Sequence, residues 1–178
     1  MKRISVAIIA VLIGISSYAQ QKILLNEDWI MKRADEVLVD GNVLSRGISD
    51  ESGWMKATVP GTVLANLVGN GIFPAPEFGL NNNLIPDIHD VGRDFYTYWF
   101  VKRFESPACE DGRHIWLNFR GINYQADVFL NGKRLNDCTL EGMFLRHSFD
   151  ITPYLASRGE QNTLAVIVYP PVFPGNPN

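Results

Sequence analysis

The sequence predicts an all-β fold, either a β-sandwich or a β-barrel. Three observations indicate this class. Segments that alternate apolar and polar residues follow one another from residue 95 onward, turn-forming residues recur between them at intervals of roughly eight to twelve positions, and only one stretch shows helical periodicity. No internal repeat or heptad pattern competes with this interpretation.

The N-terminus has the pattern of a secretory signal peptide. Basic residues at positions 2–3 precede an apolar stretch over residues 4–15, and small residues occupy the cleavage positions within 17–19. The apolar stretch is shorter than the roughly 20 residues that a transmembrane helix needs. We therefore expect residues 1–19 to be removed and residues 20–178 to form one β-sandwich domain. That domain would be exported to the periplasm or the extracellular space of a bacterium, with no membrane partner.

The charge of the chain argues against a nucleic-acid partner. The chain has 16 basic and 19 acidic residues, for a formal net charge of −3 at pH 7. Binding to phosphates requires a concentrated basic surface, and the sequence contains no basic cluster.

The two cysteines, Cys109 and Cys138, leave two interpretations open. In an oxidising compartment they can form a disulfide; otherwise they are two separate, small, partly buried residues. No further Cys or His lies close enough in sequence to complete a zinc site, so we expect no metal.

The first elements after the signal peptide are two short strands and one helix. Residues 23–25 and 29–31 have the apolar character of opening strands. Thr62 is a suitable N-cap for a helix whose apolar face lies within residues 63–68, and a glycine at position 69 or 71 ends it.

The remaining elements are strands. Residues 95–104 carry aromatic or branched side chains on both faces, which is typical of a central strand. Asn131 and Gly132 favour the backbone angles of a type I′ turn, so the segments on either side should pair as a hairpin. Thr152 and Pro153 favour a single helical turn. The expected strands are residues 95–104, 114–119, 124–131, 133–138, 144–149 and 164–168.

Residues 72–94 form a long loop that is rich in Asn and Pro. A loop of this length inside a compact domain is usually either functional or wrongly assigned as a loop. Amide-rich loops on rigid β scaffolds often bind sugar hydroxyls, so this loop is the candidate site. The alternative is that Phe73, Phe78, Leu80 and Ile85 only fix the loop to the sandwich, with the asparagines solvated.

The residues alone provide no catalytic site. His89, His114 and His147 are far apart in sequence and fit no metal or nucleophile motif. Hydrolysis of a glycoside needs two carboxyl groups about 5 to 9 Å apart, one of them protonated. Asp87 and Asp90 are more typical of solvated surface carboxylates. We assign no catalytic residue and expect no cofactor.

Five segments occur in a specific order and spacing. They are VPGTVLANLVGNGIFPAPEFGLNNNLIPDI, YTYWFVKRF, LNFRGINYQADVFLNGKRL, GMFLRHSFDIT and NTLAVIVYPP. Together they resemble the N-terminal sugar-binding domain of glycoside hydrolase family 2, from about Trp54 to Pro171. The likeness is greater to the branch that contains exo-β-glucosaminidases and β-mannosidase-like enzymes.

The resemblance implies a jelly-roll β-sandwich of galactose-binding type that supports a (β/α)8 barrel, in which two glutamates perform the hydrolysis. It implies a β-linked carbohydrate and the catalytic domains of a longer enzyme as partners, and a chain that is inactive alone. Relatives continue beyond residue 178, so we expect a truncated chain that lacks the final strands. Because the resemblance covers their loop, Asn81, Asn82 and Asp87 are the residues that we expect to contact the sugar.

The alternative function is a stand-alone carbohydrate-binding module, since jelly rolls also occur as lectin-like domains. Such a module needs exposed aromatic side chains that stack on sugar rings. Trp99 and Trp116 lie within predicted strands and Trp54 begins one, so we expect all three to pack in the core.

Overall fold

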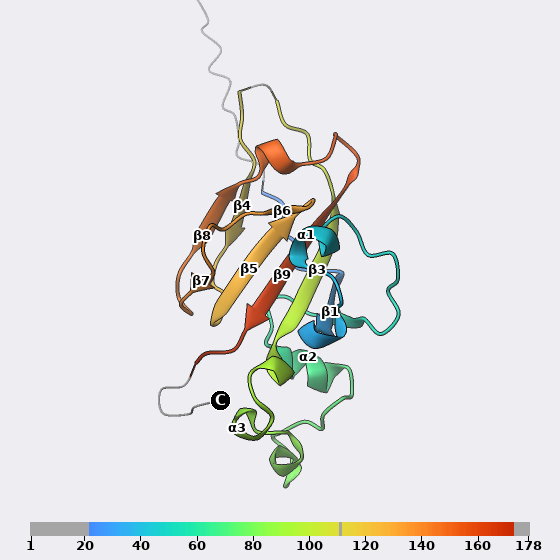
Figure 1. The fold of residues 1–178 in the computed structure, drawn as a ribbon, viewed down its shortest axis with the longest axis vertical. Coiled ribbons are helices and arrows are strands. Elements are labelled where there is room, and N and C mark those ends of the chain that lie inside the picture. The colour runs from blue at the N-terminus through green and yellow to red at the C-terminus, as the bar shows by residue number, and fades with distance from the viewer. Residues whose placement is uncertain (1–21, 111, 173–178) are drawn as a thin grey trace, which may run out of the picture.

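The computed structural model describes residues 22–110 and 112–172, which form two packed antiparallel sheets (Figure 1). The expected signal peptide, residues 1–19, lies outside this part of the chain. The larger sheet has seven strands and the smaller sheet has two. This arrangement confirms the predicted all-β sandwich.

The strands of the larger sheet run in the order β2, β1, β3, β9, β5 and β6, and β7 also pairs with β5. The smaller sheet pairs β4 with β8, and every pairing in both sheets is antiparallel. The strands are β1 (Trp29–Arg33), β2 (Met55–Ala57), β3 (Tyr98–Glu105), β4 (Trp116–Phe119), β5 (Gln125–Leu130), β6 (Lys133–Arg134), β7 (Leu140–Glu141), β8 (His147–Asp150) and β9 (Gln161–Tyr169).

β9 is the central strand of the larger sheet, because it pairs with β3 along one edge and with β5 along the other. Successive side chains of a strand point to opposite faces of the sheet. Leu164 and Val166 are buried in the cluster between the two sheets, whereas Ala165 and Ile167 are buried in a second cluster. β9 therefore contributes to both hydrophobic clusters of the domain.

The main core lies between the two sheets. Met31, Ala126 and Leu130 of the larger sheet are fully buried, and Leu117 reaches the same cluster from the smaller sheet. The buried members of this cluster are Trp29, Met31, Leu67, Tyr98, Phe100, Leu117, Ala126, Val128, Leu130, Ile151, Leu164 and Val166.

The outer face of the larger sheet is covered by the segment between β1 and β2. This segment contains α1 (Gly41–Leu44), which lies over β5 and β9 (Figure 1). Leu44 packs there with Trp99 and Phe129. A Cβ atom at Gly41 would come within 2.5 Å of the Phe129 ring, so glycine at this position permits the close approach of α1.

The predicted helix is confirmed as α2 (Val63–Gly69), and the Thr62 hydroxyl accepts a hydrogen bond from the Ala65 amide at 3.0 Å. The expectation of a single helix is wrong. Within the described residues there are also α1, α3 (Ile88–Val91) and the 3-10 turns η1 (Ala34–Glu36), η2 (Asn81–Leu84), η3 (Asp94–Tyr96) and η4 (Thr152–Tyr154). Elements of three or four residues are too short to show helical periodicity. No helix in the described ranges is long and apolar enough to cross a membrane.

The predicted hairpin turn is confirmed, with φ of 49° at Asn131 and a positive φ at Gly132. The return strand is shorter than the predicted residues 133–138, because only β6 falls within them; β7, which also pairs with β5, lies beyond them. Asn136 lies between β6 and β7, and its side-chain oxygen accepts a hydrogen bond from the Val128 amide at 2.8 Å. Its side-chain nitrogen donates to Asp127 Oδ1 at 2.8 Å. A side chain thus replaces the backbone partner that a continuous strand would supply.

Two further predictions are corrected. Residues 23–25 form no strand, and the Leu25 carbonyl instead accepts a hydrogen bond from Trp29 Nε1 at 2.7 Å. The strand expected from residue 95 begins at Tyr98, because η3 precedes it. Of the two interpretations left open for Cys109 and Cys138, the structure supports two separate residues, since both are free; they are exposed and not partly buried.

The prediction that the tryptophans pack in the core is wrong for Trp116. This side chain is 55% exposed, because Leu117 takes the inward position on β4. Trp99 is buried and Trp54 packs against the second cluster, as expected.

Replacing Leu164 by alanine tests the role of β9. The side chain is 1% exposed in the main core, so Leu164→Ala should lower the free energy of unfolding by about 2–5 kcal/mol. Urea unfolding of the purified chain measures this loss. Leu38→Ala is the matched control, since Leu38 is 97% exposed and its truncation should change stability by less than about 0.5 kcal/mol. Equal losses in the two variants would contradict the placement of β9.

Candidate functional site

The candidate site lies in the segment between α2 and β3, whose first end is fixed to the core. Leu67 of α2 is 1% exposed, and Phe73 packs against the main core. Asn66 is also buried; its side chain accepts a hydrogen bond from the Thr58 amide at 2.6 Å and donates to the Thr62 carbonyl at 2.9 Å. These contacts fix α2 against the strand β2 and its following turn.

The second end of the segment is held by Tyr96 in η3. The Tyr96 hydroxyl donates to the Pro86 carbonyl at 2.5 Å, which ties the middle of the loop to the base of β3. Burial raises the pKa of Tyr96, and the negative charge of nearby Asp87 raises it further. The phenol therefore stays protonated at neutral pH and keeps its proton for this hydrogen bond.

Arg93 joins this end of the loop to the larger sheet. Its guanidinium donates to the Pro170 carbonyl, just after β9, at 2.6 Å and to Gln125 Oε1 on β5 at 2.9 Å. The Thr97 hydroxyl in turn donates to the Arg93 carbonyl at 3.0 Å. Three segments that are distant in sequence thus meet at one arginine.

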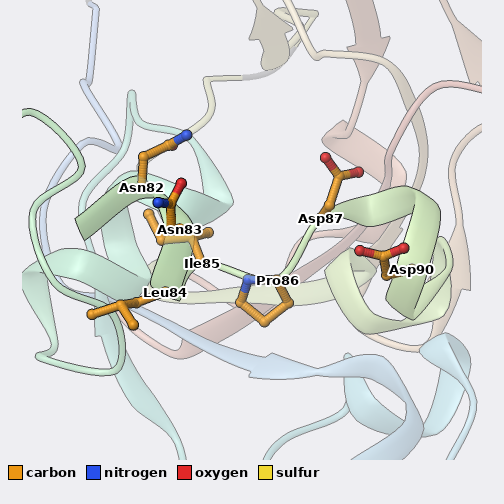
Figure 2. Close-up of a pocket in the computed structure, with 7 residues that line it drawn as sticks. All are labelled: Asn82, Asn83, Leu84, Ile85, Pro86, Asp87 and Asp90. Carbon is orange, nitrogen blue, oxygen red and sulfur yellow. The ribbon is translucent and has the colours of Figure 1, made fainter. Parts of the chain in front are cut away.

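Between these two fixed ends, residues 82–90 of the segment form an open hollow of about 480 Å³. Figure 2 shows Asn82 and Asn83 on one side of it and Asp87 and Asp90 on the other, with Pro86 between them. η2 supplies the asparagines, whereas the aspartates lie at the start of α3 and within it. The lining residues are Asn82, Asn83, Leu84, Ile85, Pro86, Asp87 and Asp90.

The structure brings together two of the three residues that we expected to contact a sugar. Asn82 and Asp87 line the hollow and are exposed. Asp87 also caps α3, since its carboxylate accepts a hydrogen bond from the His89 amide at 2.9 Å. Asn81 does not line the hollow; its side chain donates to the Ala75 carbonyl at 3.0 Å. Asn81 therefore stabilises the turn that places Asn82 at the hollow.

The alternative interpretation of the loop is only partly correct. Phe73 packs against the core and Ile85 is half-buried, as a purely structural loop requires. Phe78 and Leu80 instead are 65% and 79% exposed. The middle of the loop therefore presents both amide and apolar side chains to solvent.

The hollow can bind polar groups but has no arrangement for acid catalysis. Its carboxylates and amides can accept and donate hydrogen bonds to hydroxyl groups. Asp87 and Asp90 are both exposed, whereas a glycosidase sets its acid in an apolar pocket that keeps the carboxyl group protonated. In the described part of the chain no group of three or more His, Cys, Asp or Glu side chains is arranged to hold a metal ion.

Sequence reasoning did not identify the anchoring residues Tyr96 and Arg93. Arg93 contacts Pro170, which lies 77 positions away, and no local pattern signals such a contact. It also did not single out Asn83 and Asp90 as lining residues, although both lie within the loop that it selected.

The fold and the site define an antiparallel β-sandwich with a polar loop site. A family model described as glycosyl hydrolase 2 galactose-binding domain-like matches residues 20–178. The chain belongs to this family, which confirms the resemblance and the jelly-roll class expected from the sequence.

Relatives of known activity are much longer than this chain. A mannosylglycoprotein endo-beta-mannosidase from Lilium longiflorum is 46% identical over 157 residues, which cover 86% of this chain and 16% of the relative. An exo-beta-D-glucosaminidase from Hypocrea jecorina is 30% identical over 145 residues, covering 80% of this chain and 16% of the relative. The chain thus spans about one sixth of the length of these enzymes.

Solved structures show the same fold. The exo-chitosanase of Amycolatopsis orientalis superposes with a TM-score of 0.67 at 25% identity, over 82% of this chain and 16% of that enzyme. The beta-D-mannosidase of Dictyoglomus thermophilum superposes with a TM-score of 0.60 at 25% identity, over 83% of this chain and 15% of that enzyme.

Tyr96→Phe tests whether the phenol holds the loop. Loss of the hydrogen bond to Pro86 should favour local opening and speed chymotryptic cleavage within residues 76–91 by about two- to tenfold. Limited proteolysis followed by mass spectrometry gives these rates. Tyr154→Phe is the control, because Tyr154 lies in η4, outside the loop, and should leave them unchanged. Equal cleavage rates in the wild type and Tyr96→Phe would show that the phenol does not anchor the loop.

Proposed function

We propose that this chain is the non-catalytic N-terminal domain of an exported glycoside hydrolase family 2 β-glycosidase of the exo-β-glucosaminidase or β-mannosidase type. In the complete enzyme it supports a catalytic barrel and borders the sugar site. The observation that carries this proposal is the family match over residues 20–178 together with glycosidase relatives of which the chain covers about 16%. The leader-like pattern of residues 1–19 supports export.

The loop site has the chemistry that a bordering role requires. Asn82 and Asp87 are exposed on a turn that is anchored at both ends, so hydrogen bonds to sugar hydroxyls would not require the loop to fold on binding. Asn81 acts indirectly, by holding the turn through Ala75. The site residues of this proposal are therefore Asn82 and Asp87, with Asn81 as a positioning residue.

The exposed apolar side chains of the same loop suit a contact with another domain. Phe78, Leu80 and Leu84 are each at least 65% exposed. Such side chains close together on a surface are typical of sites that become covered by a partner. In the complete enzyme this surface would contact the catalytic domains. That contact would place the polar hollow beside their substrate.

The chain alone should not hydrolyse glycosides. Purified protein incubated with p-nitrophenyl β-D-glucosaminide and p-nitrophenyl β-D-mannoside should release p-nitrophenol no faster than buffer, because the described residues hold no buried carboxylic acid beside a second carboxylate. The downstream reading frame provides the complementary test, since it should encode a barrel with paired glutamates. Turnover by the chain alone, after removal of contaminating enzymes, would overturn the proposal.

A further inference from the structure

The outer face of the smaller sheet carries an exposed tryptophan among polar side chains. Trp116 and Asn118 on β4 alternate with the buried Leu117, and Ser148 on β8 is exposed beside them. In the antiparallel register Trp116 lies opposite Asp150, and Asn118 lies opposite Ser148. We call this surface, together with His114 just before β4, the β4–β8 platform.

Hydrogen bonds fix the polar side chains of the platform. His114 Nδ1 lies 2.5 Å from Asp150 Oδ2, and Asp150 Oδ1 accepts a hydrogen bond from the Thr152 hydroxyl at 2.6 Å. The Ser148 hydroxyl donates to Asn118 Oδ1 at 2.6 Å across the strand pair. Because these side chains are held in place, a ligand would bind them at a low entropic cost.

The platform also has a rigid backing. The inward side chains of the same two strands, Leu117, Phe119 and Phe149, pack against the main core. The rings of Phe119 and Phe149 contact each other edge to face, with centroids 6.2 Å apart. A surface backed by a packed core keeps its shape when a ligand binds.

The composition of the platform favours a sugar over a protein partner. Protein interfaces are centred on contiguous apolar patches, but Trp116 is the single apolar residue among the outward positions of β4 and β8. An aromatic ring has a negative face, which attracts the weakly positive C–H groups on the flat side of a pyranose ring. The hydroxyls at the edge of that ring need donors and acceptors, which Asn118, Ser148 and Asp150 provide.

We propose that the β4–β8 platform binds a β-linked oligosaccharide, with one sugar ring stacked on Trp116 and its hydroxyls hydrogen-bonded to Asn118, Ser148 and Asp150; the β linkage rests on the proposed function. This binding does not rest on the proposed role of the loop. β4 begins and β8 ends toward one end of the molecule, whereas α3 lies at the other end (Figure 1). The hollow is lined by residues 82–87 and 90, at the start of α3 and just before it. The platform is thus a second sugar contact, remote from the hollow.

Titration of the 178-residue chain with β-1,4-mannohexaose tests the proposal, with α-1,4-linked maltohexaose as the ligand control. Calorimetry should show binding of the β-linked chain, and Trp116→Ala should weaken it by about tenfold or more. Trp116 is the most exposed of the four tryptophans, so the sugar should also shift the fluorescence emission to the blue and protect it from acrylamide. Both fluorescence changes should vanish in Trp116→Ala and persist in Trp54→Phe.

Asp87→Asn separates the platform from the loop site. Asparagine can still cap α3, so this variant removes one of the two carboxylates of the hollow and keeps the helix, while Asp90 stays in place. The platform proposal predicts that β-1,4-mannohexaose still shifts the Trp116 fluorescence of Asp87→Asn, whatever the variant does to a contact in the hollow. Binding that is lost in Asp87→Asn but retained in Trp116→Ala would overturn the platform proposal while supporting the loop site. The absence of any binding, or equal binding of maltohexaose, would also overturn it.

Discussion

The whole domain depends on the pairing of β9 with both β3 and β5. This strand comes last in the described chain, yet it occupies the centre of the larger sheet. Its Leu164 and Val166 complete the core between the sheets, and its Ala165 and Ile167 complete the cluster under α1. Without β9, β3 and β5 would each expose an unpaired edge. Both hydrophobic clusters would also lose the buried side chains that β9 contributes.

The same constraint places the candidate site. β9 ends beside the base of β3, where the Pro170 carbonyl accepts two hydrogen bonds from Arg93, one at 2.6 Å and one at 3.2 Å. Arg93 also binds Gln125 of β5, so the loop end is positioned by the three central strands together. The hollow is open and polar, but the loop that forms it is held by Arg93 to the packed sandwich.

A network of hydrogen bonds around Asp127 stabilises the outer face of β5. Burial alone would raise the pKa of Asp127, but hydrogen bonds from Asn136 and Arg134 outweigh it and hold the pKa below its ordinary value. Burial and the neighbouring Asp127 raise the pKa of Tyr169 to about 12. The carboxylate thus stays charged and the phenol stays protonated across the physiological range, which preserves their hydrogen bond at 3.2 Å.

The elements that depend on local sequence patterns could be predicted from the sequence. Alternating side chains predicted the main strands, Asn131 and Gly132 predicted the hairpin, and Thr62 predicted the start of α2. The division of the return strand by Asn136 could not be predicted, because it depends on a side chain replacing a backbone partner.

The candidate site was predictable only in its location. The length and amide content of residues 72–94 indicated the loop, but its anchors, Tyr96 and Arg93, act through tertiary contacts. The exposure of Trp116 was missed for a different reason. Ile115, Leu117 and Phe119 alternate in the sequence and do share the inward face, which puts Trp116 on the opposite face. The prediction failed because it expected any tryptophan within a strand to pack in the core, whereas the outer face of β4 is not covered in the packed structure.

Native-state hydrogen exchange tests the central role of β9 most directly. The account predicts that the amides of β9, β3 and β5 exchange slowest, with a free energy of opening equal to that of global unfolding. Amides within residues 81–91 should exchange through local opening at a lower free energy. Fast exchange along β9, with β3 still protected, would contradict the account, because the sheet would then be stable without its central strand.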